Sequence, residues 1–236
     1  MEFTLRQTRL KENLAAVRER IGRAAASSGR TMDDVQLIAV TKYVDAAISR
    51  DLVIAGCTDL GESRPQQLWF KADELEGVDC QWHMIGHLQR NKVERTIRLT
   101  SLVHSVDSER LIAMINTQAE RLGTLVDVLL EVNTSGEVEK HGLTADEVMP
   151  FLACSDQWPH VRVRGLMTMA ARGAVGSAAR SCFAELRQLR DRLAGKCPAN
   201  VSLQELSMGM SGDFEEAILE GATLVRIGSA LFEGVE

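Results

Sequence analysis

Hydrophobic and polar residues follow two alternating patterns along the chain, one typical of helices and one typical of short buried strands. Segment 4–28 places apolar side chains at helical spacing among charged ones and ends at a Ser-Ser-Gly run, a common helix stop. The apolar run 35–41 that follows has the length and composition of a buried strand. Segment 45–56 returns to the helical pattern. The chain is therefore expected to open with a helix and then a strand–helix unit.

The same alternation continues to the end of the chain. We predict further strands at 58–61, 81–86, 102–106, 125–132, 161–167, 203–207 and 223–227, and helices at 64–76, 88–97, 108–122, 144–155, 177–195 and 212–220. Repeated strand–helix units with apolar strands indicate a parallel sheet covered by helices. About eight such strands favour closure into a barrel, although the pattern also permits an open sheet. We predict an α/β fold, a single (β/α)8 TIM-type barrel domain over 1–236 with an extra N-terminal helix.

Composition narrows the class of protein. A hydrophobic fraction of 45% and a charged fraction of 25% are ordinary for a globular domain. The net charge of −6 disfavours a nucleic-acid or membrane-surface binder, because both need a basic face. The basic segment 90–98 is most simply a solvated helix face. We therefore expect no nucleic acid and no membrane among the partners.

Cysteines, histidines and apolar runs point to the compartment. The five cysteines form no CxxC pair, and their odd count suits a reducing cytosol rather than a disulfide framework. The five histidines show no HxH or HExxH spacing, so no metal site is predicted. No apolar run is long enough to span a membrane, and the N-terminus lacks the apolar core of a signal peptide. We expect a soluble cytoplasmic protein.

Lys42 is the first candidate for chemistry. It closes the apolar strand 35–41, and the carboxyl ends of the strands are where parallel barrels carry their active sites. A lysine that is partly desolvated at such a position has a lowered pKa and suits Schiff-base chemistry. The alternative is a strand-end lysine that reaches solvent.

The last two strand ends carry residues suited to binding an anion. Ser207 to Ser211 read as a strand end and a glycine-containing turn before a helix, and Gly228-Ser229 ends the final strand. Barrels often bind phosphate with the loops after strands seven and eight. The alternative is ordinary turn and cap chemistry, with Ser211 as the helix N-cap. Arg226, inside the last apolar strand, must face either a polar ligand or a carboxylate such as Glu62.

Six segments of the chain, in the same order, resemble those of a known family. They are Leu37-Ile-Ala-Val-Thr-Lys42, Leu60-Gly-Glu-Ser63, Trp82 to Lys92 (Trp-His-Met-Ile-Gly-His-Leu-Gln-Arg-Asn-Lys), Arg164-Gly-Leu-Met167, Leu206 to Ser211, and Val225-Arg-Ile-Gly-Ser229 with Phe232. Together they resemble the YggS/PROSC-type pyridoxal phosphate homeostasis proteins, whose fold is like the N-terminal barrel of alanine racemase. Each segment alone is weak, but the ordered set over nearly the whole chain is specific.

The resemblance implies roles for individual residues. Lys42 would form a Schiff base with pyridoxal 5′-phosphate, Arg226 would lie near its pyridine nitrogen, and Met167 would lie close to its ring. The phosphate would be surrounded by Ser207, Ser211, Gly228 and Ser229. His83 and Asn91 belong to the same motifs, and we expect a structural role for both.

The chain departs from the family pattern near these residues. The family usually reads Gly-Glu-Asn where this chain has Ser63, whose side chain is shorter. It often carries a second lysine two residues after the first, where this chain has Val44. Lys140 matches a family lysine in the loop 133–142 and is the better candidate for a secondary cofactor contact.

The candidate residues favour a cofactor carrier over an enzyme. Arginine stays protonated, so it would donate to the ring nitrogen and leave the ring a weak electron sink. Racemases of this fold pair the lysine with a tyrosine from a second domain, which we do not expect here because the sequence ends at 236. The only tyrosine, Tyr43, is expected to face away from Lys42 and to pack between the barrel and its helices.

We therefore predict a non-catalytic, monomeric protein that holds pyridoxal phosphate and takes part in its intracellular homeostasis, with dependent apo-enzymes as candidate recipients. The rival is a fold-type III enzyme such as a weak amino-acid racemase. A third alternative is a cofactor-free barrel of the phosphosugar-binding type.

Overall fold

Eight parallel strands close into a barrel in the order of the sequence, with the last strand paired to the first. The computed structural model describes residues 4–137, 141–198 and 200–235. The strands are β1 (Gln36–Val40), β2 (Asp59–Glu62), β3 (Gln81–Met84), β4 (Thr100–Val106), β5 (Val126–Glu131), β6 (Val161–Met167), β7 (Val201–Ser207) and β8 (Leu224–Ile227). The predicted (β/α)8 barrel is thus confirmed.

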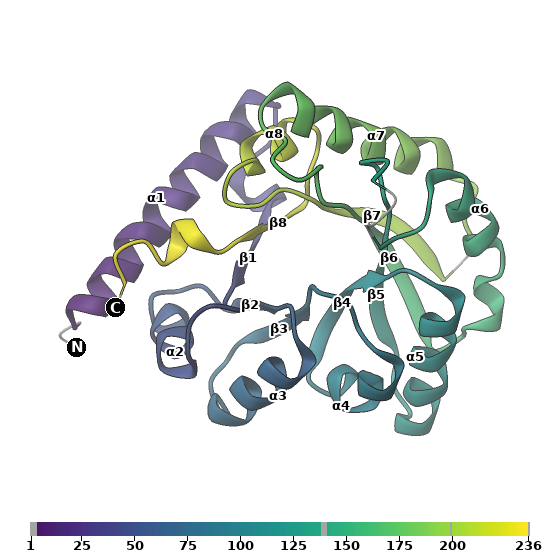
Figure 1. Ribbon diagram of the computed structural model, residues 1–236, viewed down its shortest axis with the longest axis horizontal. Helices are drawn as coiled ribbons and strands as arrows, with labels where there is room; N and C mark the ends of the chain where they lie inside the picture. Colours follow the sequence, from purple (N-terminus) through teal and green to yellow (C-terminus); the bar gives the residue numbers. More distant parts are fainter. Residues whose placement is uncertain (1–3, 138–140, 199, 236) are drawn as a thin grey trace.

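Helices surround the barrel, and one of them precedes it (Figure 1). They are α1 (Leu5–Ser27), α2 (Ala46–Ile54), α3 (Pro65–Glu74), α4 (Val93–Ile97), α5 (Glu109–Leu122), α6 (Ala145–Ala153), α7 (Ser177–Leu193) and α8 (Phe214–Leu219), with short 3-10 turns η1 (Met32–Asp34), η2 (Arg90–Lys92), η3 (Ser155–Gln157) and η4 (Ser229–Leu231). The extra N-terminal helix is α1. It buries the apolar stripe read from the sequence, and Asn13 ties it to the C-terminal segment by donating to the Leu231 and Glu233 carbonyl oxygens.

Predicted and observed elements differ mainly at two places. The predicted helix 88–97 consists of the turn η2 followed by the short α4. The predicted helix 212–220 begins later, at Phe214, because a turn comes first in which the Asp213 carboxylate accepts the Met210 N–H at 2.6 Å. Asp213, and not Ser211, occupies the N-cap position of α8. The N-cap alternative for Ser211 is therefore wrong.

The barrel has an outer and an inner apolar layer. The outer layer packs the strands against the helices, and it includes most of the buried hydrophobic side chains. The inner layer is a separate cluster of Ile38, Leu102, Leu129, Met167 and Leu224. Ile38 on β1 stands in register with Arg226 on β8, so these two side chains share the inner face of the barrel. A charged group therefore lies at the level of the inner apolar layer.

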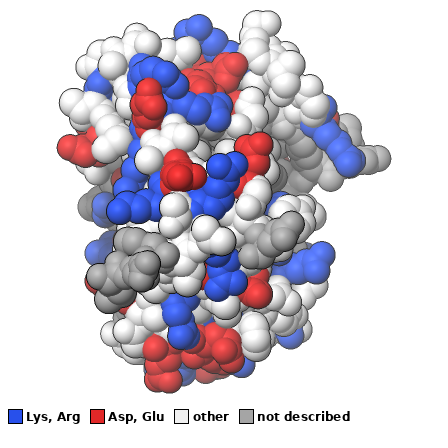
Figure 2. Space-filling view, turned by 90° about the vertical axis from the view of Figure 1, so that its left-hand side faces the viewer, with Lys and Arg blue, Asp and Glu red and all other residues white. Residues whose placement is uncertain are grey.

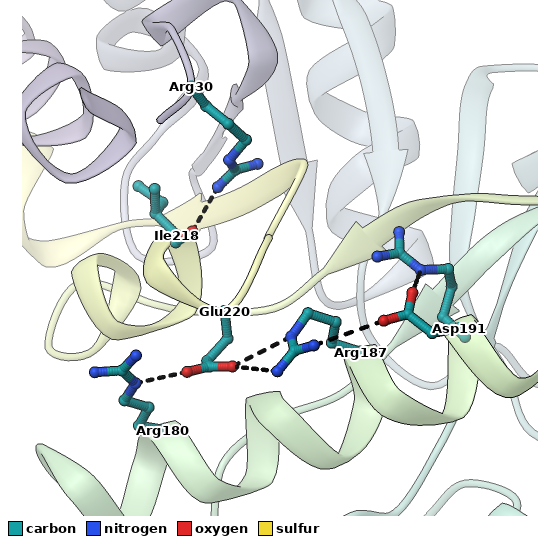
Figure 3. Close-up of polar contacts among 7 residues, drawn as sticks. Arg30, Arg180, Arg187, Asp191, Ile218 and Glu220 are labelled. Carbon is teal, nitrogen blue, oxygen red and sulfur yellow. Dashed lines mark hydrogen bonds and ion pairs between the residues drawn. The ribbon is translucent and has the colours of Figure 1, made fainter. Parts of the chain in front are cut away.

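An ion-pair cluster joins α7 to the end of α8 (Figure 3). Glu220 accepts from Arg180 at 2.6 Å and from Arg187 at 3.0 Å, and Arg187 also pairs with Asp191. From the opposite side, Arg30 donates to the carbonyl oxygen of Ile218. These contacts hold α8, and with it the loop that leads from β7 into α8.

Replacing Glu220 by glutamine is expected to destabilise the protein at neutral pH and not at low pH. Burial alone would raise the pKa of Glu220, but the hydrogen bonds from Arg180 and Arg187 outweigh it and lower that pKa. The stabilisation is therefore complete above the unfolded pKa of about 4.3 and is lost as the pH falls through the lower folded value. We expect about 1 kcal/mol at pH 7, discounted because both arginines are partly exposed. Urea unfolding of both proteins across pH 3–7 measures the difference, and a constant difference would contradict it.

The exposed surface carries charges of both signs. On the side where α1 lies in Figure 1, Lys and Arg are interspersed with Asp and Glu, and no patch of one sign covers that face (Figure 2). In the basic segment 90–98, Arg95 pairs with Asp73 and Arg98 with Glu94. Across the described part of the chain, no helix has the length and apolar character needed to cross a membrane. All five cysteines are free thiols.

Candidate functional site

The carboxyl ends of β1 and β8 lie side by side and bring the first and last candidate residues together. Lys42 follows β1 by two residues, in a turn closed by the Val44 N–H donating to the Thr41 carbonyl at 3.0 Å. Gly228 follows β8 directly, and a Cβ on it would lie 3.2 Å from the carbonyl oxygen of Val40. The turn with Lys42 and the Gly228-Ser229 turn are therefore neighbours at the mouth of the barrel.

Lys42 and Tyr43 are more exposed than their sequence pattern indicated. Lys42 is exposed in the turn rather than desolvated at a strand end, because β1 ends at Val40. Tyr43 has 87% of its surface exposed, so its expected packing between barrel and helices is wrong. The Lys42 Nζ lies 4.9 Å from the centre of the Tyr43 ring, at a cation–π distance. Lys42 is free to reach a ligand at the mouth.

A buried ion pair anchors the turn that carries Lys42. The Lys71 ammonium group donates to Glu62 Oε1 and to the Thr41 carbonyl oxygen, both at 2.6 Å, and its side chain is 2% exposed. The Thr41 hydroxyl donates to the same Glu62 oxygen at 2.8 Å. Glu62 Oε2 is buried without a hydrogen-bond partner among the described residues. A cavity of about 560 Å³ beside this ion pair is lined by Lys42, Glu62 and Lys71.

The loop between β7 and α8 faces the Gly228-Ser229 turn. The Ser211 hydroxyl accepts the Gly228 N–H at 3.1 Å and so links the two loops in which phosphate contacts were predicted. Gly209 in this loop has φ of +91°, and a Cβ on it would lie 2.6 Å from the Ala217 Cβ. Ser229 is exposed and begins η4. The loop shape depends on a glycine at 209.

Replacing Gly209 by alanine is expected to cost about 2 kcal/mol or more and to displace this loop, because the new Cβ meets both a steric clash and an unfavourable φ. The matched control is Gly212→Ala in the same loop, where the added Cβ would have no atom within 4 Å. Urea unfolding of the two variants measures the difference. Equal stabilities for Gly209→Ala and Gly212→Ala would contradict the structural role of Gly209.

Arg226 is held inside the barrel mouth by two hydrogen bonds. Its guanidinium group donates to the Ser207 hydroxyl at 2.6 Å and to the Thr168 carbonyl oxygen at 2.9 Å. Burial lowers the pKa of Arg226 to about 10, although the carboxylates of Glu131 and Asp213 raise it, so the group is a cation at neutral pH. Glu62 is engaged with Lys71 instead, so the Arg226–Glu62 pair considered from the sequence is not formed.

A series of hydrogen bonds leads from Arg226 through the barrel to Asp59, the first residue of β2. Ser207 Oγ lies 2.9 Å from His104 Nδ1, His104 Nε2 lies 3.0 Å from His83 Nδ1, and His83 Nε2 lies 3.2 Å from Asp59 Oδ1. Burial, with the nearby His83 and Arg226, lowers the pKa of His104 well below its usual value, so this ring is neutral.

With a single proton on the His104 ring, one assignment of protons satisfies every link. Ser207 donates to His104, His104 to His83, and His83 to the Asp59 carboxylate, while Ser207 accepts from Arg226. The Ser207 hydroxyl is therefore already used inside the barrel. His83, expected to be structural, is part of this series, whereas Asn91 is exposed on η2.

Comparison with known proteins places the chain in a family. The family described as "Alanine racemase, N-terminal domain" matches residues 8–235. The pyridoxal phosphate homeostasis protein of Aquifex aeolicus is 39% identical over 221 residues, which cover 94% of this chain and 96% of that protein. This chain belongs to the pyridoxal phosphate homeostasis protein family. The resemblance found in the sequence motifs is confirmed.

Two proteins of known structure share this barrel with the chain. PipY of Synechococcus elongatus, solved without pyridoxal phosphate, has a TM-score of 0.85 at 34% identity and is matched over 94% of this chain and 99% of its own. The same protein with pyridoxal phosphate bound has a TM-score of 0.83 at 33% identity. An alanine racemase of Clostridium difficile, at 16% identity and a TM-score of 0.71, shares the fold over 95% of this chain and 56% of its own.

The departures from the family pattern lie at the rim of the site. Ser63 is half-buried and lines the same cavity as Lys42, as does Val44. The Ser63 backbone passes so close to Gly86 that a Cβ there would lie 2.3 Å from its carbonyl oxygen. Met167 is buried in the inner apolar layer. Lys140, the predicted secondary contact, lies outside the described residues.

Proposed function

We propose that this chain binds pyridoxal phosphate, holds it as a Schiff base on Lys42, and serves pyridoxal phosphate homeostasis in the cytoplasm without catalytic turnover. The observation that carries the proposal is the juxtaposition of the Lys42 turn with the Gly228-Ser229 turn at the neighbouring ends of β1 and β8. An amine and an anion-binding loop are then available at one barrel mouth. The relatives named for pyridoxal phosphate homeostasis, and the ligand bound to PipY, support the choice of cofactor.

The phosphate end of the proposed site rests on the two joined loops. Ser211, Gly228 and Ser229 offer hydroxyl and backbone N–H groups, and the absence of a side chain at Gly228 lets its turn lie close to Val40. Of the predicted phosphate contacts, Ser207 fits least well, since its hydroxyl is committed to Arg226 and His104. We therefore propose that Ser207 serves the cofactor through Arg226.

The ring end of the proposed site rests on Arg226, with Met167 as the apolar neighbour of the ring. Two hydrogen bonds, to the Ser207 hydroxyl and the Thr168 carbonyl oxygen, hold the Arg226 guanidinium group at the level of the inner apolar layer. An arginine partner donates to a pyridine nitrogen and does not protonate it, which weakens the ring as an electron sink. When bound, the cofactor would supply an electrophilic aldehyde for the lysine, and this environment favours holding it over carbanion chemistry.

Tyr43, the only tyrosine of the chain, is poorly suited to act as an opposing base. It follows Lys42 directly and turns into solvent. Two-base racemisation needs a second group across the substrate from the lysine. A weak amino-acid racemase is therefore the rival function and not the one that we propose.

A turnover screen separates the two functions. The protein loaded with pyridoxal phosphate is incubated with each of the common L-amino acids, and racemisation and elimination are followed by chiral chromatography. We expect rates no higher than those of free pyridoxal phosphate at the same concentration. Turnover well above that level for any amino acid, lost in Lys42→Ala, would contradict the carrier function and support the racemase.

A further inference from the structure

A second group of chemically active side chains lies on the rim of the barrel, apart from the cavity lined by Lys42. His87 follows β3 by three residues, Asp107 follows β4 directly, and His141 lies in the connection from β5 to α6. The carboxyl ends of neighbouring parallel strands converge, so residues far apart in the sequence meet there. Histidine spacing along the chain could not reveal this group, because each residue comes from a different strand end.

The three side chains point their ligand atoms at one another. His87 Nδ1 lies 3.2 Å and His141 Nδ1 lies 3.9 Å from the same carboxylate oxygen, Asp107 Oδ2. All three ligand atoms lie within 4.8 Å of one another. Ligands about 2.0–2.2 Å from a tetrahedral Zn²⁺ are roughly 3.4 Å apart, so the three ligand atoms lie near the spacing that one ion requires.

The two imidazole rings are stacked, with centroids 4.7 Å apart and planes inclined by 20°. Two imidazolium cations would repel each other in this arrangement. Both Nδ1 atoms face the same carboxylate oxygen. A cation bound by both rings must lie in the plane of each, so one ring would have to rotate out of the stack for the two lone pairs to reach it.

The carboxylate of the group is held in place. Asp107 is only 11% exposed, and its second oxygen accepts the Ser108 hydroxyl at 3.0 Å, which leaves Oδ2 to the histidines.

We propose that His87, Asp107 and His141 form a binding site for a divalent transition-metal cation, with Zn²⁺ or Co²⁺ as the best-suited ions. Two imidazole nitrogens and one carboxylate oxygen select such ions over Mg²⁺ and Ca²⁺, which prefer all-oxygen sites. A cavity of about 840 Å³ is lined by His87 and Asp107, so a fourth position faces open space. That position can take water or a small anionic ligand.

The test is titration of the reduced 236-residue chain with Co²⁺ alone, and binding is followed by calorimetry and by absorbance. We expect one ion per chain, with a spectrum of nitrogen and oxygen ligands and no thiolate charge-transfer band. His87→Ala, His141→Ala and Asp107→Asn should each weaken binding at least tenfold. His160→Ala, on the loop before β6 and outside the group, is the matched control and should bind as the wild type does.

Thermal melting shows whether each variant is folded. The three residues lie at the rim of the barrel, so their variants should melt at the same temperature as the wild type. The proposal is overturned if the wild type binds no Co²⁺ below millimolar concentration. It is equally overturned if His87→Ala and His141→Ala bind as tightly as His160→Ala, or if a thiolate band shows that cysteines hold the ion. The outcome is independent of whether Lys42 carries pyridoxal phosphate.

Discussion

Replacing Lys42 by alanine is expected to abolish covalent retention of pyridoxal phosphate and to leave the fold intact. Lys42 is exposed in a turn, so its truncation should change the free energy of unfolding by no more than about 0.5 kcal/mol. The proposed phosphate-binding residues and Arg226 would remain, so weak, reversible binding of the cofactor should survive. Absorbance after gel filtration measures the retained cofactor, and urea unfolding measures the stability.

The matched control for this variant is Lys196→Ala, which removes another exposed lysine beyond the end of α7. It should retain the cofactor as the wild type does. If Lys42→Ala still retained the cofactor through gel filtration as the wild type does, the Schiff base would have to lie on a different amine. That result would contradict the proposed role of Lys42.

Replacing Lys71 by methionine is expected to destabilise the protein by about 3–5 kcal/mol, the cost of leaving a buried carboxylate unpaired. Glu62 is 0% exposed, and its Oε2 already has no partner among the described residues, so loss of the Lys71 contact leaves the carboxylate with no cationic partner and only the Thr41 hydroxyl as a donor. The Thr41 carbonyl also loses its donor, and the adjacent turn with Lys42 loses its anchor. Urea unfolding at pH 7 measures the loss.

The double variant Glu62→Gln with Lys71→Met is the informative control, since it removes both charges. It should recover a large part of the stability lost in Lys71→Met, because no buried ion then remains unpaired. A loss below about 1 kcal/mol in the single variant, or no recovery in the double variant, would show that the pair does not anchor this part of the barrel.

The fold could be predicted because strand and helix patterns alternate so regularly. Apolar runs such as 128–130 and 165–167 are buried on both faces of the sheet, and the intervening helices keep one polar face. What the pattern missed was local. The predicted strand 35–41 ends at Val40, so the alternation of faces that was applied to Lys42 and Tyr43 does not hold in the turn they occupy.

The candidate site was only partly predictable, because its buried polar partners come from distant parts of the chain. Ser207 and His104 are 103 residues apart, and no local pattern joins them. The available signal was a polar residue inside an apolar strand, as at His83, His104 and Glu62, since each must find a partner when buried. That signal says that a partner exists without naming it, and Lys71 on a helix gave no sign of burial.

Borohydride reduction of the protein loaded with pyridoxal phosphate, followed by peptide mass analysis, tests the central claim most directly. Reduction fixes a Schiff base on the amine that carries it. The proposed function predicts a pyridoxyl group on the peptide containing Lys42 and none on the peptide containing Lys71. A pyridoxyl group on any other lysine as the main product, or on none, would contradict it.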